Sequence, residues 1–349
     1  MSDFDAILLV SFGGPENDEE VMPFLEHVVE GRGVPRERLL SVAEHYYKLG
    51  GSPINGQNRD LIGALRDELE EHAEGRPIYF GNRHSAPFLK DTLAQMAKDG
   101  VKSAAAILTS AFSSYSGCRQ YREAVLAAQE AISDAPKVRY VRRFFNHPGF
   151  IDAMVDRIGE ALDQLGADGA RIAFTAHSIP VSMADGCDYV EQLMDVSEVI
   201  AGRVGVSQWQ LVYQSRSGPP QVPWLEPDIL DHIEALRQIG TEKLVVAPIG
   251  FVSDHMEVVW DLDHEAKDAC EAAGIAMVRA GTVGTHPTFV AGLRELLQEL
   301  RDDSPNKRAL GTLGPRVNPC AQGCCPRPKR RPRPAGAGGR PPRAPNQDG

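Results

Sequence analysis

The chain has 349 residues and a formal net charge of −11, with 42% hydrophobic and 24% charged residues. This length exceeds one ordinary hydrophobic core and predicts two lobes of roughly 150 residues each. The sequence holds no run of 18 consecutive apolar residues, and its acidic start lacks the basic, apolar pattern of a signal peptide. We therefore expect a cytoplasmic protein without a transmembrane segment.

The charge is unevenly distributed along the chain. Residues 315–349 hold eight Arg or Lys and one Asp, whereas residues 1–314 hold 29 basic and 47 acidic side chains. Phosphate repels such an acidic body, so we expect no nucleic-acid partner. The basic end could contact nucleic acid or anionic lipid, but its Pro-, Gly- and Arg-rich composition favours a solvated, disordered tail.

Short apolar runs alternate with longer helical patterns from the N-terminus onward. The expected strands are 6–10, 77–81, 104–109, 138–144, 171–176, 210–214, 244–248 and 276–280. The expected helices include 57–73, 89–98, 120–132, 148–165, 226–239 and 287–301. Because strands that alternate with helices are typical of βαβ units, we predict an α/β protein with two doubly wound, Rossmann-like lobes. Each lobe should contain a parallel four-stranded sheet.

The pattern also predicts where the lobes begin and end. The expected parts are an N-terminal α/β lobe at 1–147, a C-terminal α/β lobe at 148–304, a cysteine-containing extension at 305–326 and a disordered basic, Pro-rich tail at 327–349. Ligands in doubly wound folds bind beyond the carboxyl ends of the strands, so candidate functional residues are sought there.

Polar segments follow five of the expected strands. They are residues 11–15, 110–121, 177–180, 213–219 and 251–257. The chain contains no G-x-G-x-x-G, P-loop or G-x-S-x-G motif. This disfavours a sugar-phosphate or nucleotide-binding protein and a hydrolase.

Two of these segments carry residue types suited to metal chemistry. His177 ends an apolar strand, where a structural histidine is as plausible as a functional one. Glu257, Asp261 and Glu265 recur every four residues and would form one acidic stripe on a helix. A solvated face would explain the stripe, but its apolar neighbours favour a path for a divalent cation. Imidazole binds Fe(II) and is a base near neutral pH, so His177 and Glu257 could bind metal, accept protons, or both.

Five ordered segments resemble the motifs of the ferrochelatase family. They are residues 8–15, 50–55, 177–180, 213–227 and 248–263, within a resemblance that runs from about residue 4 to 301. The overall pattern is similar to the actinobacterial branch, whose members make iron-coproporphyrin III. The resemblance implies a chelatase-like fold and a lyase of haem biosynthesis that inserts Fe(II) into coproporphyrin III with release of two protons. Insertion into protoporphyrin IX is the alternative, and a monomer is expected.

The resemblance also implies roles for individual residues. His177 and Glu257 would face each other across the porphyrin and bind the iron, with Asp261 and Glu265 behind Glu257 as a metal supply line. Ser52 and Tyr121 would contact the porphyrin or its carboxylates. Phe12 occupies a position that is Tyr in some relatives, but a phenyl ring cannot ligate iron. The segment 50–53 is one residue shorter than in some relatives.

Cysteines gather at the end of the expected folded region. The six cysteines are Cys118, Cys187, Cys270, Cys320, Cys324 and Cys325. A chance cluster in a disordered tail is one interpretation. Some relatives hold a [2Fe–2S] cluster with one mid-chain and three C-terminal cysteines, which implies Cys118, Cys320, Cys324 and Cys325 as ligands here. These residues should then lie close together in the folded protein.

Two other functions compete with iron insertion. A cobalt or nickel chelatase of tetrapyrroles would share the two-lobe plan, but segments 213–227 and 248–263 favour iron. A non-catalytic porphyrin- or haem-binding protein would need neither a base nor an acidic metal path. The pair of His177 and Glu257 therefore favours an enzyme.

Overall fold

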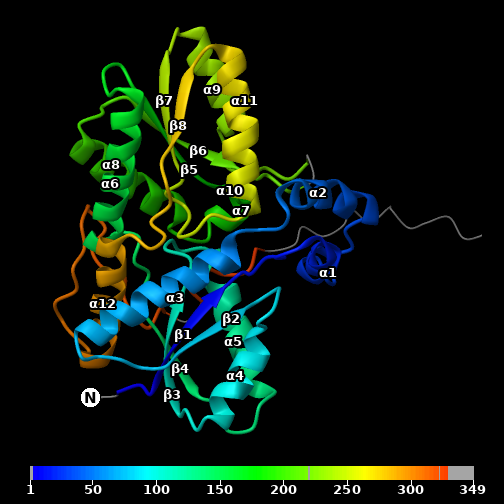
Figure 1. Ribbon diagram of the computed structural model, residues 1–349, viewed down its shortest axis with the longest axis vertical. Helices are drawn as coiled ribbons and strands as arrows, with labels where there is room; N and C mark the ends of the chain where they lie inside the picture. The colour runs from blue at the N-terminus through cyan, green and yellow to red at the C-terminus, as the bar shows by residue number, and fades with distance from the viewer. Residues whose placement is uncertain (1–2, 219–220, 322, 329–349) are drawn as a thin grey trace, which may run out of the picture.

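Two parallel four-stranded sheets, one above the other along the long axis of the molecule, form the framework of the computed structural model (Figure 1). The structure describes residues 3–218, 221–321 and 323–328. The first sheet has the order β2-β1-β3-β4, from β1 (Ala6–Ser11), β2 (Ile78–Asn82), β3 (Ser103–Leu108) and β4 (Lys137–Tyr140). The second has the order β6-β5-β7-β8, from β5 (Arg171–His177), β6 (Trp209–Gln214), β7 (Lys243–Ala247) and β8 (Ala276–Arg279).

Helices connect consecutive strands within each lobe. The first lobe contains α1 (Asp18–Val28), α2 (Arg36–Leu49), α3 (Ile54–Glu71), α4 (Leu89–Lys98), η1 (Tyr115–Arg119) and α5 (Gln120–Glu130). The second contains α7 (Val181–Ala184), α8 (Tyr189–Val204), α9 (Ile229–Gln238), α10 (Met256–Val258), η2 (Val259–Ala266) and α11 (Lys267–Ala273). Helix α6 (Pro148–Leu165) joins β4 to β5, and α12 (Pro287–Asp302) follows β8 and packs against α6 and α3. The predicted α/β class with two Rossmann-like lobes is confirmed. No helix among these described residues is long and apolar enough to span a membrane.

Two sequence expectations about individual elements were wrong. The strand expected at 138–144 ends at Tyr140, and the chain then continues outside regular structure. A buried apolar run has the same sequence pattern in a strand and in a packed loop. Periodicity alone therefore could not predict where β4 ends. The helix that carries Glu257 is not α-helical throughout, because its middle, η2, is a π-helix.

Matching His-Pro pairs start the two helices that join the lobes. His147 caps α6 and His286 caps α12, each through a ring nitrogen that accepts a backbone N–H of the first turn. The following proline suits the first helical position, where its missing N–H costs nothing. Gly149 and Gly292 let these helices approach closely, since a Cβ added to Gly149 would lie 2.8 Å from Gly292 Cα.

One large hydrophobic cluster spans both lobes, and each sheet has a further cluster of its own on its other face. The large cluster contains Ile7 and Leu9 of β1, Phe144 and Phe150 between the lobes, and Phe174 of β5. A smaller cluster joins α1 and α2 to the start of α10. Its buried members are Val21, Phe24, Leu25, Leu39, Ala43, Tyr46 and Met256.

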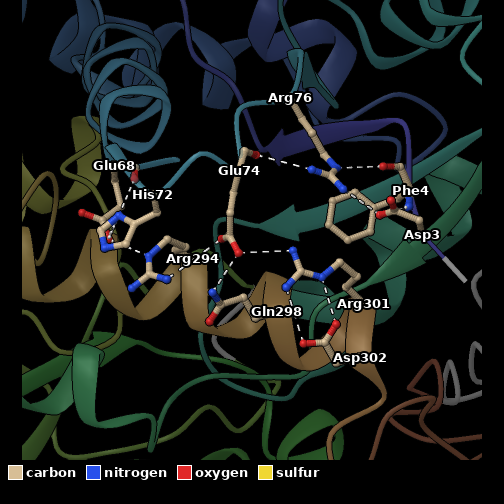
Figure 2. A network of polar contacts seen from close by, with 10 residues as sticks. All are labelled: Asp3, Phe4, Glu68, His72, Glu74, Arg76, Arg294, Gln298, Arg301 and Asp302. Carbon is tan, nitrogen blue, oxygen red and sulfur yellow. Dashed lines mark hydrogen bonds and ion pairs between the residues drawn. The ribbon is translucent and has the colours of Figure 1, made fainter. Parts of the chain in front are cut away.

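Polar contacts reinforce the lobe boundary along α12 (Figure 2). Glu74, beyond the end of α3, accepts hydrogen bonds from Gln298 and Arg301 of α12 at 3.0 and 3.2 Å. Arg294 on the same helix pairs with Glu68 of α3 at 2.8 Å. The first lobe is therefore attached to a helix that lies late in the chain.

Candidate active site

His177 and Glu257 lie against each other beyond the carboxyl ends of two neighbouring strands, β5 and β7. His177 is the last residue of β5, and Glu257 lies in α10, which begins a few residues after β7. β5 and β7 are paired in parallel, so their carboxyl ends point to the same edge of the sheet. His177 Nε2 is 3.5 Å from Glu257 Oε2, and both side chains are half-buried. The structure therefore brings together the two residues expected at the metal. The implied arrangement across the porphyrin is wrong, because a macrocycle cannot lie between two side chains that are in contact.

Backbone contacts set the orientation of the His177 ring. His177 Nδ1 lies within hydrogen-bond reach of the Ser178 carbonyl, which can only accept. The proton of the neutral ring therefore lies on Nδ1, and the Nε2 lone pair points toward Glu257. Tyr189 donates a hydrogen bond to the His177 carbonyl at 3.0 Å and so fixes the backbone of His177.

Burial and charge act in opposite directions on this pair. Burial alone would lower the pKa of His177, but the negative charge of Glu257 and the hydrogen bonds of the ring outweigh it and leave the pKa raised. Burial alone would raise the pKa of Glu257, but the charge of His177 and its hydrogen bond lower it. The pair therefore favours proton uptake at His177 beside an ionised Glu257.

Asp261 lies next along the acidic stripe and is held from the end of β6. Ser215 donates a hydrogen bond to Asp261 Oδ2, and Gln214 Nε2 reaches the same oxygen at 3.3 Å. Gln214 also reaches the Glu257 carbonyl at 3.3 Å. Burial and the charge of Glu257 raise the pKa of Asp261 to about 7, so this carboxyl can exchange a proton near neutral pH.

Glu265 forms the far end of the stripe. It accepts a hydrogen bond from Trp260 Nε1 at 2.8 Å, and the Trp260 ring stacks on His45 of α2 with ring centroids 4.1 Å apart. The acidic residues Asp261 and Glu265 both lie on η2, whose wider π-helical turns often occur at functional sites. The stripe thus extends from Glu257 toward the first lobe.

Ser52 contacts the backbone immediately before Glu257. Its hydroxyl oxygen accepts a hydrogen bond from the backbone N–H of Met256 at 3.3 Å, one residue before Glu257. Gln57 accepts the Asp254 N–H at 2.8 Å in the same way. Two side chains of the first lobe therefore position the segment that carries Glu257.

Phe12 and Tyr121 lie together in the first lobe. The guanidinium of Arg83 lies 5.7 Å from the Phe12 ring centroid and 4.8 Å from that of Tyr121. Phe12 also packs against His84 at a centroid distance of 4.6 Å. Tyr121 is buried, and burial raises the pKa of its hydroxyl. The structure groups these residues around Arg83, and their contact with a porphyrin stays a prediction.

Two groups near the site carried no sequence signal that singled them out. Arg279, at the end of β8, bonds Asp263 at 2.5 Å and Asp254 at 3.1 Å. These carboxylates flank the stretch that contains Glu257 and Asp261. His255 Nδ1 lies 4.0 Å from Glu257 Oε2, and burial lowers its pKa. His255 at least belongs to a polar segment that follows an expected strand, whereas Arg279 lies inside the expected strand 276–280.

The cysteine extension folds back onto η1. Cys118 Sγ lies 4.0 Å from Cys325 Sγ, which in turn lies 3.6 Å from Cys324 Sγ. The hydrogen bond with Cys325 lowers the pKa of Cys118 to about 6, with help from nearby arginines. Cys187 is a fourth neighbour, since the charges of Cys118 and Cys324 act on its thiol.

The cysteine group includes Cys320 as well. Charges of Cys324 and Cys118 add to burial in raising the Cys320 pKa. The expected proximity of Cys118 to the extension is thus confirmed. Across the described ranges 3–218, 221–321 and 323–328, however, no three or more His, Cys, Asp or Glu side chains are arranged so that they could hold a metal ion. Most of the expected tail, residues 329–349, lies outside the described residues.

Solved structures of tetrapyrrole chelatases share this fold. SirB from Bacillus subtilis with Fe3+ covers 85% of this chain and 96% of its own, with a TM-score of 0.56 at 11% sequence identity. The sirohydrochlorin chelatase SirB in complex with cobalt, from Bacillus subtilis subspecies spizizenii, covers 85% and 95% with a TM-score of 0.52 at 10% identity. At this identity the likeness concerns the fold alone.

Sequence relatives are much closer. A ferrochelatase of Rhodopirellula baltica is 53% identical over 97% of this chain and 97% of its own length. A coproporphyrin III ferrochelatase of Streptomyces coelicolor is 50% identical over 97% and 96%. One from Nocardia farcinica is 50% identical over 95% and 99%. The family model for ferrochelatase matches residues 4–300, and the chain belongs to the ferrochelatase family.

Proposed function

We propose that this chain inserts Fe(II) into coproporphyrin III, with release of the two pyrrole N–H protons. The observation that carries the proposal is the contact between His177 Nε2 and Glu257 Oε2 at 3.5 Å, at the start of an acidic stripe. Relatives about 50% identical over nearly the whole chain bear the name coproporphyrin III ferrochelatase. Protoporphyrin IX is the alternative substrate.

The proposed reaction begins with proton removal. His177 Nε2 accepts a proton from a pyrrole nitrogen, and the adjacent charge of Glu257 stabilises the resulting imidazolium. Asp261 can relay protons outward because its pKa lies near neutrality. Two protons leave for each Fe(II) that enters, so the net charge of the system is balanced.

The acidic stripe would deliver the metal. Carboxylate oxygens bind hard divalent cations, and Glu265, Asp261 and Glu257 follow one another along one continuous helix. We propose that Fe(II), as substrate, moves from Glu265 past Asp261 to Glu257. Ser52 and Gln57 keep the receiving end of this route fixed relative to the first lobe.

An anaerobic assay with both porphyrins tests the proposal. Purified protein, Fe(II) and either coproporphyrin III or protoporphyrin IX are mixed, and metalloporphyrin absorption is followed. We expect faster turnover with coproporphyrin III. Faster turnover with protoporphyrin IX would overturn the substrate assignment, and no turnover with either would overturn the chelatase activity.

We further propose that Cys118, Cys320, Cys324 and Cys325 hold a [2Fe–2S] cluster. Support comes from the two short Sγ–Sγ distances and from the acidic Cys118 thiol, since thiolates are the ligands that such clusters need. The described side chains would have to converge further to bind it. The cluster would fasten the extension to η1 and takes no part in the proposed insertion steps.

Visible absorption of anaerobically purified protein tests the cluster. We expect a coloured protein that loses its colour in Cys118→Ser and Cys320→Ser. Cys270→Ser is the matched control, because this buried cysteine belongs to the core of the second sheet. A colourless, iron-free preparation with full activity and stability would contradict the proposal.

The remaining proposals concern the cellular location, oligomeric state and partners of the enzyme. We propose a cytoplasmic monomer that binds no nucleic acid. The acidic balance of residues 1–314 supports the last point, because phosphate backbones repel such a surface. Light scattering of the purified protein would check the monomer.

A further inference from the structure

Gln214 links the histidine of the candidate active site to its acidic stripe. It is the last residue of β6 and is fully buried. Its register partner on β5 is His177, and its carbonyl accepts the Ser178 N–H at 2.8 Å. The carbonyl of Ser178 in turn lies beside His177 Nδ1. The backbone of Gln214 therefore fixes the peptide that orients the histidine ring.

The side chain of Gln214 reaches two residues of the stripe. Its Nε2 donates to the Glu257 carbonyl and to Asp261 Oδ2, each at 3.3 Å. A carbonyl can only accept a hydrogen bond, so the nitrogen of the amide, and not its oxygen, must face Glu257. Gln214 Oε1 has no partner among the described residues. The amide is therefore held in this orientation through its donor group alone.

The backbone after Gln214 brings a second donor to the same carboxylate. Successive side chains of a strand point to opposite faces of the sheet. Ser215 instead has a φ of 63°, in the left-handed region that residues other than glycine rarely adopt. The strand thus ends in a turn, and Ser215 Oγ donates to the same Asp261 oxygen that Gln214 reaches. Two consecutive residues therefore hold one oxygen of Asp261.

Glu257 and Asp261 lie on either side of a change in helix type. Helix α10 ends at Val258, and the π-helix η2 begins at Val259. The hydrogen-bond spacing of the helix changes at this point, and two negative side chains one turn apart repel each other. The Gln214 amide bonds the backbone on one side of the junction and the carboxylate on the other. It therefore fixes Asp261 relative to Glu257.

We propose that Gln214 is a positioning residue for the transfer of Fe(II) from Asp261 to Glu257. This inference rests on the proposed function, because it concerns the route by which the metal enters. Gln214 acts through its neighbours and not on the iron itself. Groups that orient metal ligands through hydrogen bonds strengthen metal binding, because the ligands are already in place when the ion arrives. Loss of the amide should weaken binding of the cation and leave porphyrin affinity unchanged.

Gln214→Met tests the proposal, because methionine has nearly the length of glutamine and cannot donate a hydrogen bond. Steady-state kinetics with Fe(II) and porphyrin varied in turn should show an Fe(II) KM raised about tenfold and an unchanged porphyrin KM. Gln214→Asn keeps the amide on a side chain that is one methylene shorter and should shift the Fe(II) KM in the same direction. The Asn variant decides the matter if methionine prevents folding.

Binding of Mn(II) without porphyrin separates this inference from the proposed function. Mn(II) prefers carboxylate oxygens to thiolates, so it reports on the acidic stripe rather than on the cysteines. The loss of the free Mn(II) resonance measures binding to the full chain in iron-free buffer. Both Gln214 variants should raise the Mn(II) Kd about tenfold. If the unaltered chain inserted no iron but this shift appeared, the proposed reaction would fail and the role of Gln214 in holding the metal ligands would stand.

Gln192→Met is the matched control. Gln192 of α8 is also fully buried, and its amide bonds the Ser113 N–H at 2.8 Å and the Ser113 hydroxyl at 3.0 Å. This variant should lower the thermal midpoint as Gln214→Met does, but leave the Fe(II) KM and the Mn(II) Kd unchanged. Unchanged values in the Gln214 variants would overturn the proposal. So would an equal rise in Gln192→Met, because the effect would then follow from the loss of any buried amide.

Discussion

The Ser52 hydroxyl accepts the backbone N–H of Met256 across the boundary between the two lobes, at 3.3 Å. Met256 is the residue immediately before Glu257. The resemblance to ferrochelatases implies a porphyrin contact for Ser52. The structure shows instead a hydrogen bond that positions the backbone next to Glu257. A substrate contact and this positioning contact lead to different results when the hydroxyl is removed.

Ser52→Ala should therefore lower turnover more than porphyrin affinity. Loss of one hydrogen bond of this kind corresponds to about 1 kcal/mol, or about a fivefold slower insertion. Steady-state kinetics with porphyrin and with Fe(II) varied in turn would measure it. Ser41→Ala, on exposed α2, is the control and should change neither value. A rise in porphyrin KM with unchanged kcat would instead show that Ser52 mainly contacts substrate.

His177→Ala should abolish insertion while porphyrin still binds. Porphyrin binding depends mainly on apolar burial, whereas deprotonation requires the base, whose loss costs roughly 10²–10⁴-fold in rate. Fluorescence quenching measures porphyrin binding, and metalloporphyrin absorption measures insertion. His72→Ala, on the surface beyond α3, should retain activity. If binding disappeared and turnover per bound porphyrin stayed normal, the role of base would be wrong.

Asp261→Asn should stabilise the protein at alkaline pH. Below about pH 4 the Asp261 carboxyl is protonated in both the folded and the unfolded chain, and its contribution there is nil. Between pH 4 and its folded pKa of about 7, only the unfolded chain releases this proton, so folding loses stability as the pH rises. Above pH 7 the loss is constant.

Asp261→Asn removes this loss of folding stability, because an amide does not titrate. We expect a gain of about 1–2 kcal/mol in unfolding free energy at pH 8 and little change at pH 4, because a half-open site weakens the full effect. Urea denaturation at both pH values would measure it. The same variant should need more Fe(II) for half-maximal rate, since a metal-binding carboxylate is lost. Equal stability of both proteins at pH 8 would count against the raised pKa.

Arg279→Gln should loosen the segment 254–263, which contains Glu257. Removing the guanidinium leaves the Asp254 and Asp263 carboxylates without their shared partner, which typically costs about 3 kcal/mol for a buried pair. We expect a higher Fe(II) KM, a lower kcat and unchanged porphyrin affinity, with partial rescue by Arg279→Lys. The control Arg237→Gln breaks a solvent-exposed pair on α9 and should leave both stability and kinetics unchanged.

Sequence periodicity was sufficient to predict most of the framework. The helices at 89–98 and 148–165 were placed with the observed bounds, and all eight strands were found. Their apolar runs are continuous because parallel strands covered on both faces bury every residue, as β1 does. The pairing of His177 with Glu257 was implied by the family resemblance, and the sequence pattern added only that both residues follow strands of the same sheet.

The contacts that support the site could not be predicted in this way. Arg279 meets its carboxylates, and His45 meets Trp260, only after segments distant in sequence have packed together. A π-helical turn such as η2 differs from an α-helix by one residue in hydrogen-bond spacing, which the spacing of acidic residues does not reveal. Cys187 seemed an isolated cysteine, yet in the fold the charges of Cys118 and Cys324 raise the pKa of its thiol.

The core shared by β1 and β5 determines which parts of this molecule can move. Lobes with separate cores could open like a clamshell around a flat macrocycle, but here that motion would expose Phe144, Phe150 and their neighbours to water. The two sheets should therefore melt together in one cooperative transition. Helices α1 and α2 lie at one side of the molecule (Figure 1), and a separate small cluster of buried side chains packs them against Met256. Any displacement of α1 and α2 would therefore be transmitted to Met256, the residue immediately before Glu257.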